Sequence, residues 1–522
     1  MDQDYAAAIA GFRIEDATAI LQGSLEHGLN ACVECCDRHS GTALDWEGVD
    51  GRRESVSFAE FRERASRMAG LLVASGIQPG DVVAGMLPRT PALLALILGT
   101  WRAGAVYQPL FTAFGPKAIE HRLRMSGAKF VVTDAANRPK LDEVAGAPQT
   151  LVVSDIVDAL ARQPAEFEPV LRRGSDLFLM MSTSGTTGPP KGVPVPLAAL
   201  PAFGAYVRDA IGLRPEDRFW NLADPGWAYG LYYAITGPLL LGHATTFYEG
   251  AFSAEACLRV IRTHGITNRA GAPTAFRLLK AADAAAVAPV RGQLRVVSSA
   301  GEPLNPEVIR WFDEHLGVPV NDHYGQTEIG MVVNNFHGLP HDIRPGSAGF
   351  PTPGMRLAVL DDAGAELGAN APGVLAVDLA HSPMNWFTGY WRQPLDARYY
   401  RTGDTVEWEP DGRISFIGRS DDVITSSGYR IGPFDVESAL IEHPAVIEVA
   451  VIGKPDPERT EIVKAFVVLG AGYEPTPALA EELQLFVKRR LSAHAFPREI
   501  QFMAELPKTP SGKIQRFVLR AG

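Results

Sequence analysis

The chain has 522 residues, more than one hydrophobic core usually organises, so at least two domains are expected. Its 46% hydrophobic and 21% charged residues are typical of a folded globular protein and exclude a disordered or fibrous one. The 60 acidic and 49 basic side chains give a net charge of -11, which disfavours nucleic acid and anionic membranes as partners.

The cysteines and the N-terminus indicate an intracellular protein. Cys32, Cys35 and Cys36 lie in "ACVECCDRH", which we interpret as an amphipathic helix rather than a zinc or redox site; Cys257 is distant. The first residues lack the basic flank and apolar run of a secretory signal. The longest apolar run, Pro91 to Trp101, is too short to span a bilayer. We therefore expect a cytoplasmic location and no membrane span.

From about residue 55 the pattern alternates between helix and strand. Ser57 and Glu60 form a capping box, and the helix that follows is predicted to end at Gly76. Further helices are predicted over 91–103 and 117–125, and strands over 81–87, 105–110 and 129–134. This alternation predicts parallel βαβ units.

A similar alternation runs from about 200 to 330, with buried strands predicted in 242–249 and 294–303. After residue 340, short strands and many Gly and Pro turns favour an antiparallel β subdomain. A charged, glycine-punctuated stretch over 418–433 then precedes a compact α+β pattern. The fold class expected is α/β: a large N-terminal domain (1–418) of βαβ subdomains plus a small β subdomain, followed by a small, mobile α+β C-terminal domain (419–522).

The stretch "TSGTTGPPKG", from Thr183 to Gly192, has the composition of a phosphate-binding loop. Glycines let backbone N–H groups approach a ligand, and the hydroxyls and Lys191 add donors and a charge. The apolar run before it predicts a buried strand, so the loop is expected at a carboxyl strand end, where α/β sheets bind ligands. Pro190 and Gly192 flank the lysine, which disfavours a P-loop kinase or GTPase. Taken singly, the stretch also fits a flexible polar turn.

Four further segments follow in order: "HYGQTE" (323–328), "YRTGD" (400–404), "GRSDD" (418–422) and "PKTPSGKI" (507–514). Together with the loop they resemble the signatures of the adenylate-forming superfamily, over residues 40 to the C-terminus. Through "SAGEPLNPEV", "SSGYRIGPFDVESAL" and "ELPKTPSGKI" the chain looks most like medium-chain acyl-CoA synthetases. The resemblance implies an AMP-forming ligase. ATP and a carboxylic acid form an acyl-adenylate and pyrophosphate, and coenzyme A then displaces AMP.

The resemblance also assigns residues to ATP and its metal. Lys513 would neutralise charge during adenylation, Thr327 would contact the α-phosphate or the acid, and Glu328 would bind Mg²⁺. Tyr324 would stack on adenine, and Asp404 would accept the ribose hydroxyls. The full set of ATP-binding residues expected is Thr183, Ser184, Gly185, Thr186, Thr187, Gly188, Lys191, Gly301, Glu302, Pro303, Asp322, His323, Tyr324, Gly325, Gln326, Thr327, Asp404, Arg419 and Lys513.

The second half-reaction is assigned in the same way. Asp421 would be the hinge about which the C-terminal domain turns. Ser427, Gly428 and Tyr429 would line the pantetheine channel, and Arg459 would meet a CoA phosphate. Arg430 would contact the AMP phosphate. Thr425 departs from the Lys or Asn of many relatives, which leaves the contacts near the hinge open.

The acyl pocket is expected among residues 224–233, 298–301 and 325–335, with Trp227 at its junction with the pantetheine channel. Acetyl-CoA synthetases carry tryptophan where Gly325 stands, so the resemblance implies an acid longer than acetate. Medium-chain, branched and aryl acids all stay open, and no selector for a second polar group is evident. Two other functions stay open: acyl transfer to a carrier-protein thiol, and a non-catalytic nucleotide-binding protein. The sequence predicts no oligomeric state.

Overall fold

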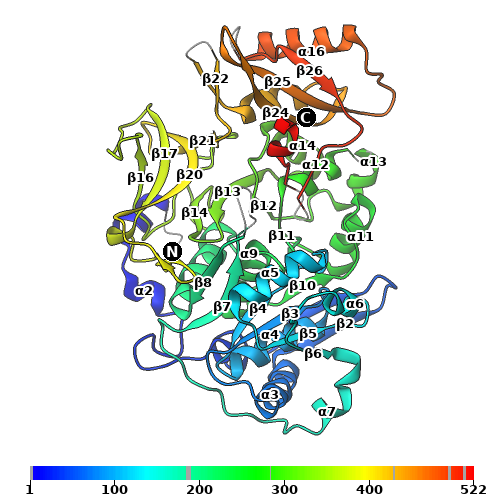
Figure 1. Ribbon diagram of the computed structural model, residues 1–522, viewed down its shortest axis with the longest axis vertical. Helices are drawn as coiled ribbons and strands as arrows, with labels where there is room; N and C mark the ends of the chain where they lie inside the picture. Colours follow the sequence, from blue (N-terminus) through cyan, green and yellow to red (C-terminus); the bar gives the residue numbers. More distant parts are fainter. Residues whose placement is uncertain are drawn as a thin grey trace.

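The computed structural model describes residues 4–183, 190–281, 284–426, 429–491, 495–509 and 513–521. Within these residues the strands form sheets of nine, six, four and two strands in a large N-terminal part, and a five-stranded sheet in a small C-terminal part. The C-terminal part, orange to red in Figure 1, lies beyond the ends of the nine-stranded and four-stranded sheets. The predicted fold class, a large α/β domain followed by a small α+β domain, is confirmed.

The six-stranded sheet, as far as the described residues show it, has the order β6-β5-β3-β4-β7-β8. Strands β3 to β7 run parallel, as βαβ units require, and β8 returns antiparallel. The predicted capping box is present at the N-terminus of α3, where the Ser57 hydroxyl accepts a hydrogen bond from the Glu60 amide. The elements are α3 (Phe58–Ala74), β3 (Val82–Met86), α4 (Pro91–Arg102), β4 (Val106–Pro109), α5 (Pro116–Ser126), β5 (Phe130–Thr133), β6 (Gln149–Val152), β7 (Leu177–Ser182) and β8 (Gly192–Pro196). The helices and strands predicted from 55 to 134 are therefore confirmed.

The nine-stranded sheet has the order β15-β14-β13-β12-β11-β9-β10-β1-β2 across the described part of the chain. Its central strands from β13 to β1 are parallel, and both edges turn antiparallel. The strands are β1 (Thr42–Glu47), β2 (Arg53–Ser57), β9 (Phe219–Asn221), β10 (Thr245–Tyr248), β11 (Asn268–Gly271), β12 (Val296–Ala300), β13 (Val320–Gln326), β14 (Gly330–Asn334) and β15 (Phe350–Pro351). Helices α11 (Ala254–His264), α12 (Pro273–Lys280) and α14 (Pro306–Leu316) supply a core on one face. The strands predicted in 242–249 and 294–303 are confirmed.

The predicted antiparallel subdomain is also confirmed. It consists of β16 (Leu357–Leu360), β17 (Pro372–Asp378), β20 (Tyr399–Trp408) and β21 (Ile414–Arg419), with a hairpin of β18 (Gly389–Tyr390) and β19 (Gln393–Pro394) beside it. The antiparallel register pairs Asp404 on β20 with Arg419 on β21. Asp404 and Arg419 are thereby placed side by side on neighbouring strands.

The C-terminal sheet contains β22 (Ile424–Ser426), β23 (Tyr429–Ile431), β24 (Val446–Asp456), β25 (Thr460–Leu469) and β26 (Glu499–Phe502), with helices α15 (Pro433–Ile441), α16 (Pro477–Arg490) and α17 (Arg516–Ala521). Sheet membership changes between Arg419 and Ile424, and the boundary after residue 418 stays our proposal. Two contacts join α14 and α15: Asn305 Nδ2 donates to Ser438 Oγ at 3.0 Å, and Arg310 pairs with Glu442 at 3.0 Å.

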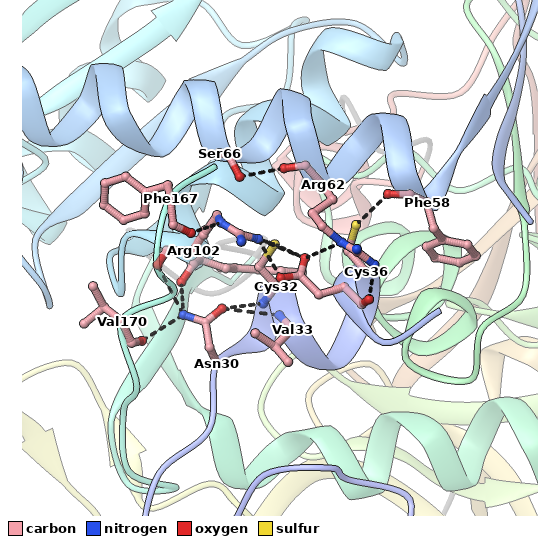
Figure 2. A network of polar contacts seen from close by, with 12 residues as sticks. Asn30, Cys32, Val33, Cys36, Phe58, Arg62, Ser66, Arg102, Phe167 and Val170 are labelled. Carbon is pink, nitrogen blue, oxygen red and sulfur yellow. Dashed lines mark hydrogen bonds and ion pairs between the residues drawn. The ribbon is translucent and has the colours of Figure 1, made fainter. Parts of the chain in front are cut away.

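In the N-terminal region, a buried polar network connects residues 30–37 to α4 (Figure 2). Arg102, 5% exposed, pairs with Asp37 at 2.7 Å, and Asn30 donates to the Trp101 and Val170 carbonyls at 2.8 Å each. The predicted helix around Cys32 is present as a π-helical turn, η1 (Val33–Asp37). All four cysteine thiols are free and buried. They contribute to the core of the fold.

Short helices complete the described fold. They are α1 (Tyr5–Ala10), α2 (Ile14–Thr18), α6 (Arg138–Asp142), η2 (Val153–Asp155), α7 (Val157–Ala161), η3 (Leu197–Ala199), α8 (Leu200–Ala205), η4 (Tyr206–Ala210), α9 (Ala228–Gly230), η5 (Leu231–Thr236), α10 (Gly237–Leu240), α13 (Ala284–Val287), η6 (Ala288–Val290) and η7 (Leu379–His381). Among the described residues, no helix has both the length and the hydrophobicity needed to cross a bilayer.

Candidate active site

A cavity of about 760 Å³ lies between the large N-terminal part and the C-terminal part. Its walls come from the ends of β12 and β13, from β20 and β21, and from the segments around α15 and α17. The predicted residues that line it are Thr183, Lys191, Gly301, Glu302, Pro303, Asp322, His323, Tyr324, Gly325, Gln326, Thr327, Glu328, Asp404, Arg419, Asp421 and Lys513. Segments separated by more than 300 residues thus meet at one cavity.

The β13–β14 hairpin forms one wall, and Gly325 is required by its backbone. The register of the two strands shifts between Tyr324 and Gly325. A Cβ atom on Gly325 would lie 2.1 Å from the Gly330 carbonyl oxygen and 2.7 Å from Met331 Sδ. A larger side chain therefore cannot enter without moving the hairpin. From the sequence, Gly325 is expected to leave the pocket open where acetyl-CoA synthetases carry tryptophan, and in the structure Met331 lies next to that position.

Asp404 is the centre of a hydrogen-bonded group in the cavity. Its Oδ2 accepts from Tyr324 Oη at 2.6 Å and from Gln326 Nε2 at 2.8 Å, and its Oδ1 lies 3.4 Å from Arg419 Nη1. Burial raises the pKa of Asp404, and Arg419 opposes that shift. Tyr400 Oη donates to Gln326 Oε1 at 2.8 Å, which fixes the orientation of the amide. The remaining acceptor capacity of this carboxylate lies at Oδ1.

Glu328 is 8% exposed and accepts from Tyr390 Oη at 2.9 Å. Burial raises the pKa of its carboxyl, and the Tyr390 hydrogen bond opposes that rise. Lys191 Nζ lies 4.6 Å from the centroid of the Tyr390 ring, so one tyrosine connects the predicted phosphate loop to Glu328. Thr327, the neighbour of Glu328, accepts from Tyr232 Oη through its carbonyl at 3.1 Å.

The carboxylate of Glu328 is suited to Mg²⁺, a cation that proteins often hold by one or two carboxylates together with substrate phosphates. No cluster of three or more Asp, Glu, His or Cys side chains that could bind a metal occurs in the described ranges. A magnesium ion at Glu328 would take its other ligands from the nucleotide and water.

The predicted phosphate loop connects β7 to β8 as a hairpin. Its two ends are held together, because the Thr183 amide donates to the Lys191 carbonyl and the Lys191 amide donates to Thr183 Oγ1, both at 2.9 Å. This strand-to-strand connection differs from the strand-to-helix geometry of a P-loop. Ser184, Gly185, Thr186, Thr187 and Gly188 lie outside the described residues.

Lys513 approaches the cavity from the C-terminal part. Its amide donates to Thr509 Oγ1 at 3.1 Å, and its carbonyl accepts from the Thr509 amide at 2.7 Å. Its charge is close enough to oppose the burial that raises the pKa values of Glu328 and Asp404. Lys513 therefore lines the same cavity as these two carboxylates of the N-terminal part.

Asp421 lies in the turn between β21 and β22, with its carboxylate 3.4 Å from Arg419 Nε. The next residue, Asp422, is held by α17, because it pairs with Arg516 at 3.8 Å and with Arg520. Arg516 also pairs with Glu437 at 2.6 Å. The predicted hinge is thus adjacent to the last helix.

Other predicted residues lie elsewhere. Trp227 packs on Phe111 and Phe114, with ring centroids 5.7 and 5.4 Å away, and does not line this cavity. Arg459 lies in the turn between β24 and β25, where its amide donates to Asp456 at 2.9 Å. The backbones of Tyr429 and Arg430 form β23, and Ser427 and Gly428 lie outside the described residues. The Thr425 amide donates to Glu461 Oε2 at 2.7 Å.

Several residues of the cavity were not predicted from the sequence. Tyr390, which contacts both Lys191 and Glu328, lies in the cluster "NWFTGYW", whose composition indicates only β structure. Arg277 pairs with the predicted residue Glu302 at 2.9 Å, and Thr274 donates to the same carboxylate. Arg516 is the second residue after the "PSGKI" segment, and this proximity could have indicated that it lies at the cavity.

Comparison with known proteins identifies two matching family models. The model "AMP-binding enzyme" matches residues 36–391, and "AMP-binding enzyme C-terminal domain" matches residues 435–513. The chain is 40% identical to the acetyl-coenzyme A synthetase of Bacillus subtilis, covering 94% of this chain and 90% of the relative. It is 36% identical to the mitochondrial acyl-coenzyme A synthetase ACSM3 of Rattus norvegicus, covering 92% and 87%. The crystal structure of an acyl-CoA synthetase from Brucella canis is 62% identical, with a TM-score of 0.82 over 99% of this chain and 98% of that one.

Proposed function

The chain belongs to the AMP-binding enzyme family and is an AMP-forming acyl-CoA synthetase, and from this premise we propose that its acid is longer than acetate. The class proposed is a medium-chain, branched or aryl carboxylic acid. The observation that carries the proposal is that position 325 is a glycine at which even a Cβ atom would lie 2.1 Å from the Gly330 carbonyl oxygen, so no side chain from this position closes the pocket. The match to an acetyl-coenzyme A synthetase makes acetate the alternative to exclude.

ATP, the acid and coenzyme A are the substrates. In the first half-reaction the carboxylate oxygen attacks the α-phosphorus of ATP and the bond to pyrophosphate breaks. In the second, the CoA thiol loses its proton and attacks the acyl carbonyl carbon, and AMP leaves. We propose that Lys513 and Thr327 stabilise the charge that develops on the acid and the α-phosphate.

The other residue roles follow from the same proposal. Asp404 and Arg419 would hold the ribose, Tyr324 the adenine ring, and Lys191 with the loop after Thr183 the outer phosphates. A magnesium ion bound by Glu328 would neutralise phosphate charge. The approach of Lys513 to Glu328 and Asp404 supports an arrangement suited to adenylation. Rotation about Asp421, CoA binding by Ser427, Gly428, Tyr429 and Arg459, and a cytoplasmic location stay predictions.

The test is an acid panel with ATP and CoA, with and without Mg²⁺. Acetate, butyrate, isobutyrate, hexanoate, octanoate and benzoate are compared by release of pyrophosphate and by identification of the nucleotide product. We expect AMP, dependence on Mg²⁺, and higher kcat/KM for one of the longer acids than for acetate. Acetate as the best substrate would overturn the proposed acid while leaving the ligase activity intact, and ADP as the product would overturn the reaction.

A further inference from the structure

A chain of three polar side chains lies behind the wall of the cavity. Tyr229 Oη is 3.0 Å from Tyr206 Oη, and Tyr206 Oη is 2.7 Å from His323 Nδ1. Tyr229 lies on α9, in the segment 224–233 where the acyl pocket is expected, while Tyr206 begins η4 and His323 lies on β13. Tyr206 and His323 are 1% and 2% exposed, so their polar atoms depend on one another.

The direction of these hydrogen bonds follows from one backbone carbonyl. His323 Nε2 lies 3.0 Å from the Asn335 carbonyl oxygen, which can only accept, so Nε2 carries a proton. Burial lowers the pKa of His323 to about 3, which keeps the ring neutral and leaves Nδ1 as an acceptor. Tyr206 therefore donates its single proton to Nδ1.

The same reasoning extends to Tyr229. Because the Tyr206 proton is used on His323, the Tyr206 oxygen can only accept, and Tyr229 must donate to it. The Tyr229 proton is then used as well. Toward any other group, the Tyr229 oxygen is an acceptor and cannot donate.

Of the three residues in this chain, Tyr229 has the largest exposed fraction. It is partly exposed, whereas its aromatic neighbours Tyr206, Tyr232 and Tyr233 are each at most 2% exposed. Strand register puts His323 beside Ala300, so Ser298, two residues earlier, faces the same side of the sheet. Ser298 Oγ is buried and has no hydrogen-bond partner among the described residues, and neither has Asn221 Nδ2, which lies in the same row of the sheet two strands away. This side of the sheet is therefore polar as well as aromatic.

We propose that Tyr229 selects acids whose acyl chain carries a hydrogen-bond donor, a hydroxyl or an amino group. The inference rests on the proposed function and names a narrower substrate class for the same pocket. A hydrogen-bond donor on the substrate satisfies the Tyr229 oxygen. A methyl group at the same place on the substrate gives that oxygen no donor. An oxo group on the substrate places a second acceptor against the Tyr229 oxygen. Sites built around such a hydrogen bond reject analogues that lack the donor.

The experiment uses matched acids at several chain lengths, from 3-hydroxypropanoate to 6-hydroxyhexanoate. Each is compared with the acid that has a methyl group in place of the hydroxyl, and with the corresponding oxo acid. At the length that reaches Tyr229, we expect the hydroxy acid to exceed its methyl partner about tenfold in kcat/KM, and the oxo acid to be the poorest.

Two variants test the mechanism. Tyr229→Phe should remove the preference for the hydroxy acid. Tyr206→Phe frees the Tyr229 proton, so the oxo acid should become a better substrate while the hydroxy acid is retained. Tyr5→Phe is the matched control. The Tyr5 phenol donates to the Pro351 carbonyl at 2.9 Å, and Tyr5 does not line the cavity. Thermal unfolding of each variant confirms that it is folded.

The outcomes separate the two proposals. If methyl-terminated acids are equal or better at every length, and Tyr229→Phe leaves the preferences unchanged, the role of Tyr229 is overturned while the proposed ligase stands. If no acid of any series yields AMP, the proposed function itself fails.

Discussion

Burial dominates the electrostatics of single residues around the cavity. It raises the pKa values of Asp322, Glu328 and Asp404, so burial disfavours the charged forms of these three carboxyl groups. Arg419 and Lys513 oppose this effect at Asp404. Lys513 belongs to the C-terminal part, so the charge balance of the cavity depends on where that part lies.

Lys513→Ala should suppress adenylation far more than thioester formation from a supplied acyl-adenylate. A lost charge contact to the transition state costs about 2–4 kcal/mol, or roughly 30- to 1000-fold in rate. Pyrophosphate exchange measures the first step, and CoA consumption from acyl-adenylate the second. Lys454→Ala, which removes an ion pair with Glu499 at 2.5 Å, is the control. Equal losses in both steps would contradict the assigned role.

Asp322 should make stability depend on pH. Burial raises its pKa to about 8, above the value of 3.8 for an exposed Asp, so the folded state retains a proton that the unfolded state loses. The contribution is present at acidic pH and is lost as pH rises through 8, at roughly 1.4 kcal/mol per pH unit in between.

Asp322→Asn should remove this dependence. Compared with the wild type, the variant should gain relative stability steadily from pH 5 to pH 8 in urea unfolding. Asp362→Asn, at an exposed position, should run parallel to the wild type. A constant difference between Asp322→Asn and the wild type across this range would show that the carboxyl is ionised in the folded protein.

At the scale of elements, the β13–β14 hairpin carries the predicted nucleotide-binding residues from Asp322 to Thr327, together with Glu328. Its geometry depends on a close backbone approach, since Gly325 has no space for a Cβ atom. The bulge at this position re-aims the residues that follow, which include Gln326 and Glu328. Gly325 therefore has two effects on the site: it permits the close approach of the β13 and β14 backbones, and it adds no side chain to the cavity.

Gly325→Ala should lower both stability and activity. The added methyl group would meet the Gly330 carbonyl at 2.1 Å, and overpacking of this kind costs about 1–3 kcal/mol. Differential scanning calorimetry should show a lower Tm, and pyrophosphate release should fall with it. Gly368→Ala is the matched control, because a Cβ there meets nothing within 4 Å. An unchanged Tm for Gly325→Ala would refute the backbone constraint.

At the scale of the whole molecule, the site is complete only when the two parts of the chain meet. The contacts from Asn305 to Ser438 and from Arg310 to Glu442 join α14 to α15, and Glu442 also pairs with Arg490 at 2.9 Å. The two ion pairs of Glu442 lie near the surface and are individually weak. They stabilise this arrangement without preventing another.

Arg310→Ala should therefore slow adenylation modestly and leave thioester formation from acyl-adenylate undiminished. An exposed ion pair contributes about 0.2–1 kcal/mol, which corresponds to at most about a fivefold change. Single-turnover measurements of the two steps test this. Arg489→Ala, on the exposed side of α16, controls for the loss of a surface charge. A larger effect on thioester formation than on adenylation would contradict the proposed use of this contact.

Local patterns determined the elements and the family. Ser57 with Glu60 predicts the start of α3, an apolar run predicts β7, and ordered motifs of a few residues indicate the adenylate-forming resemblance, because each depends on neighbours within one turn or strand. The order of strands in the sheets was not predictable from these patterns, since it depends on pairing between segments far apart.

The sequence by itself therefore determined the domain types, the class of reaction and the residues that carry its motifs. The tertiary structure alone decided that Trp227 packs on Phe111 outside the cavity, that Tyr390 connects Lys191 to Glu328, and that Tyr229, Tyr206 and His323 form one hydrogen-bonded chain. The physical reason is that a hydrogen bond depends on distance and direction in space. The 93 residues between Tyr229 and His323 contain no local signal that the two belong to one hydrogen-bonded chain.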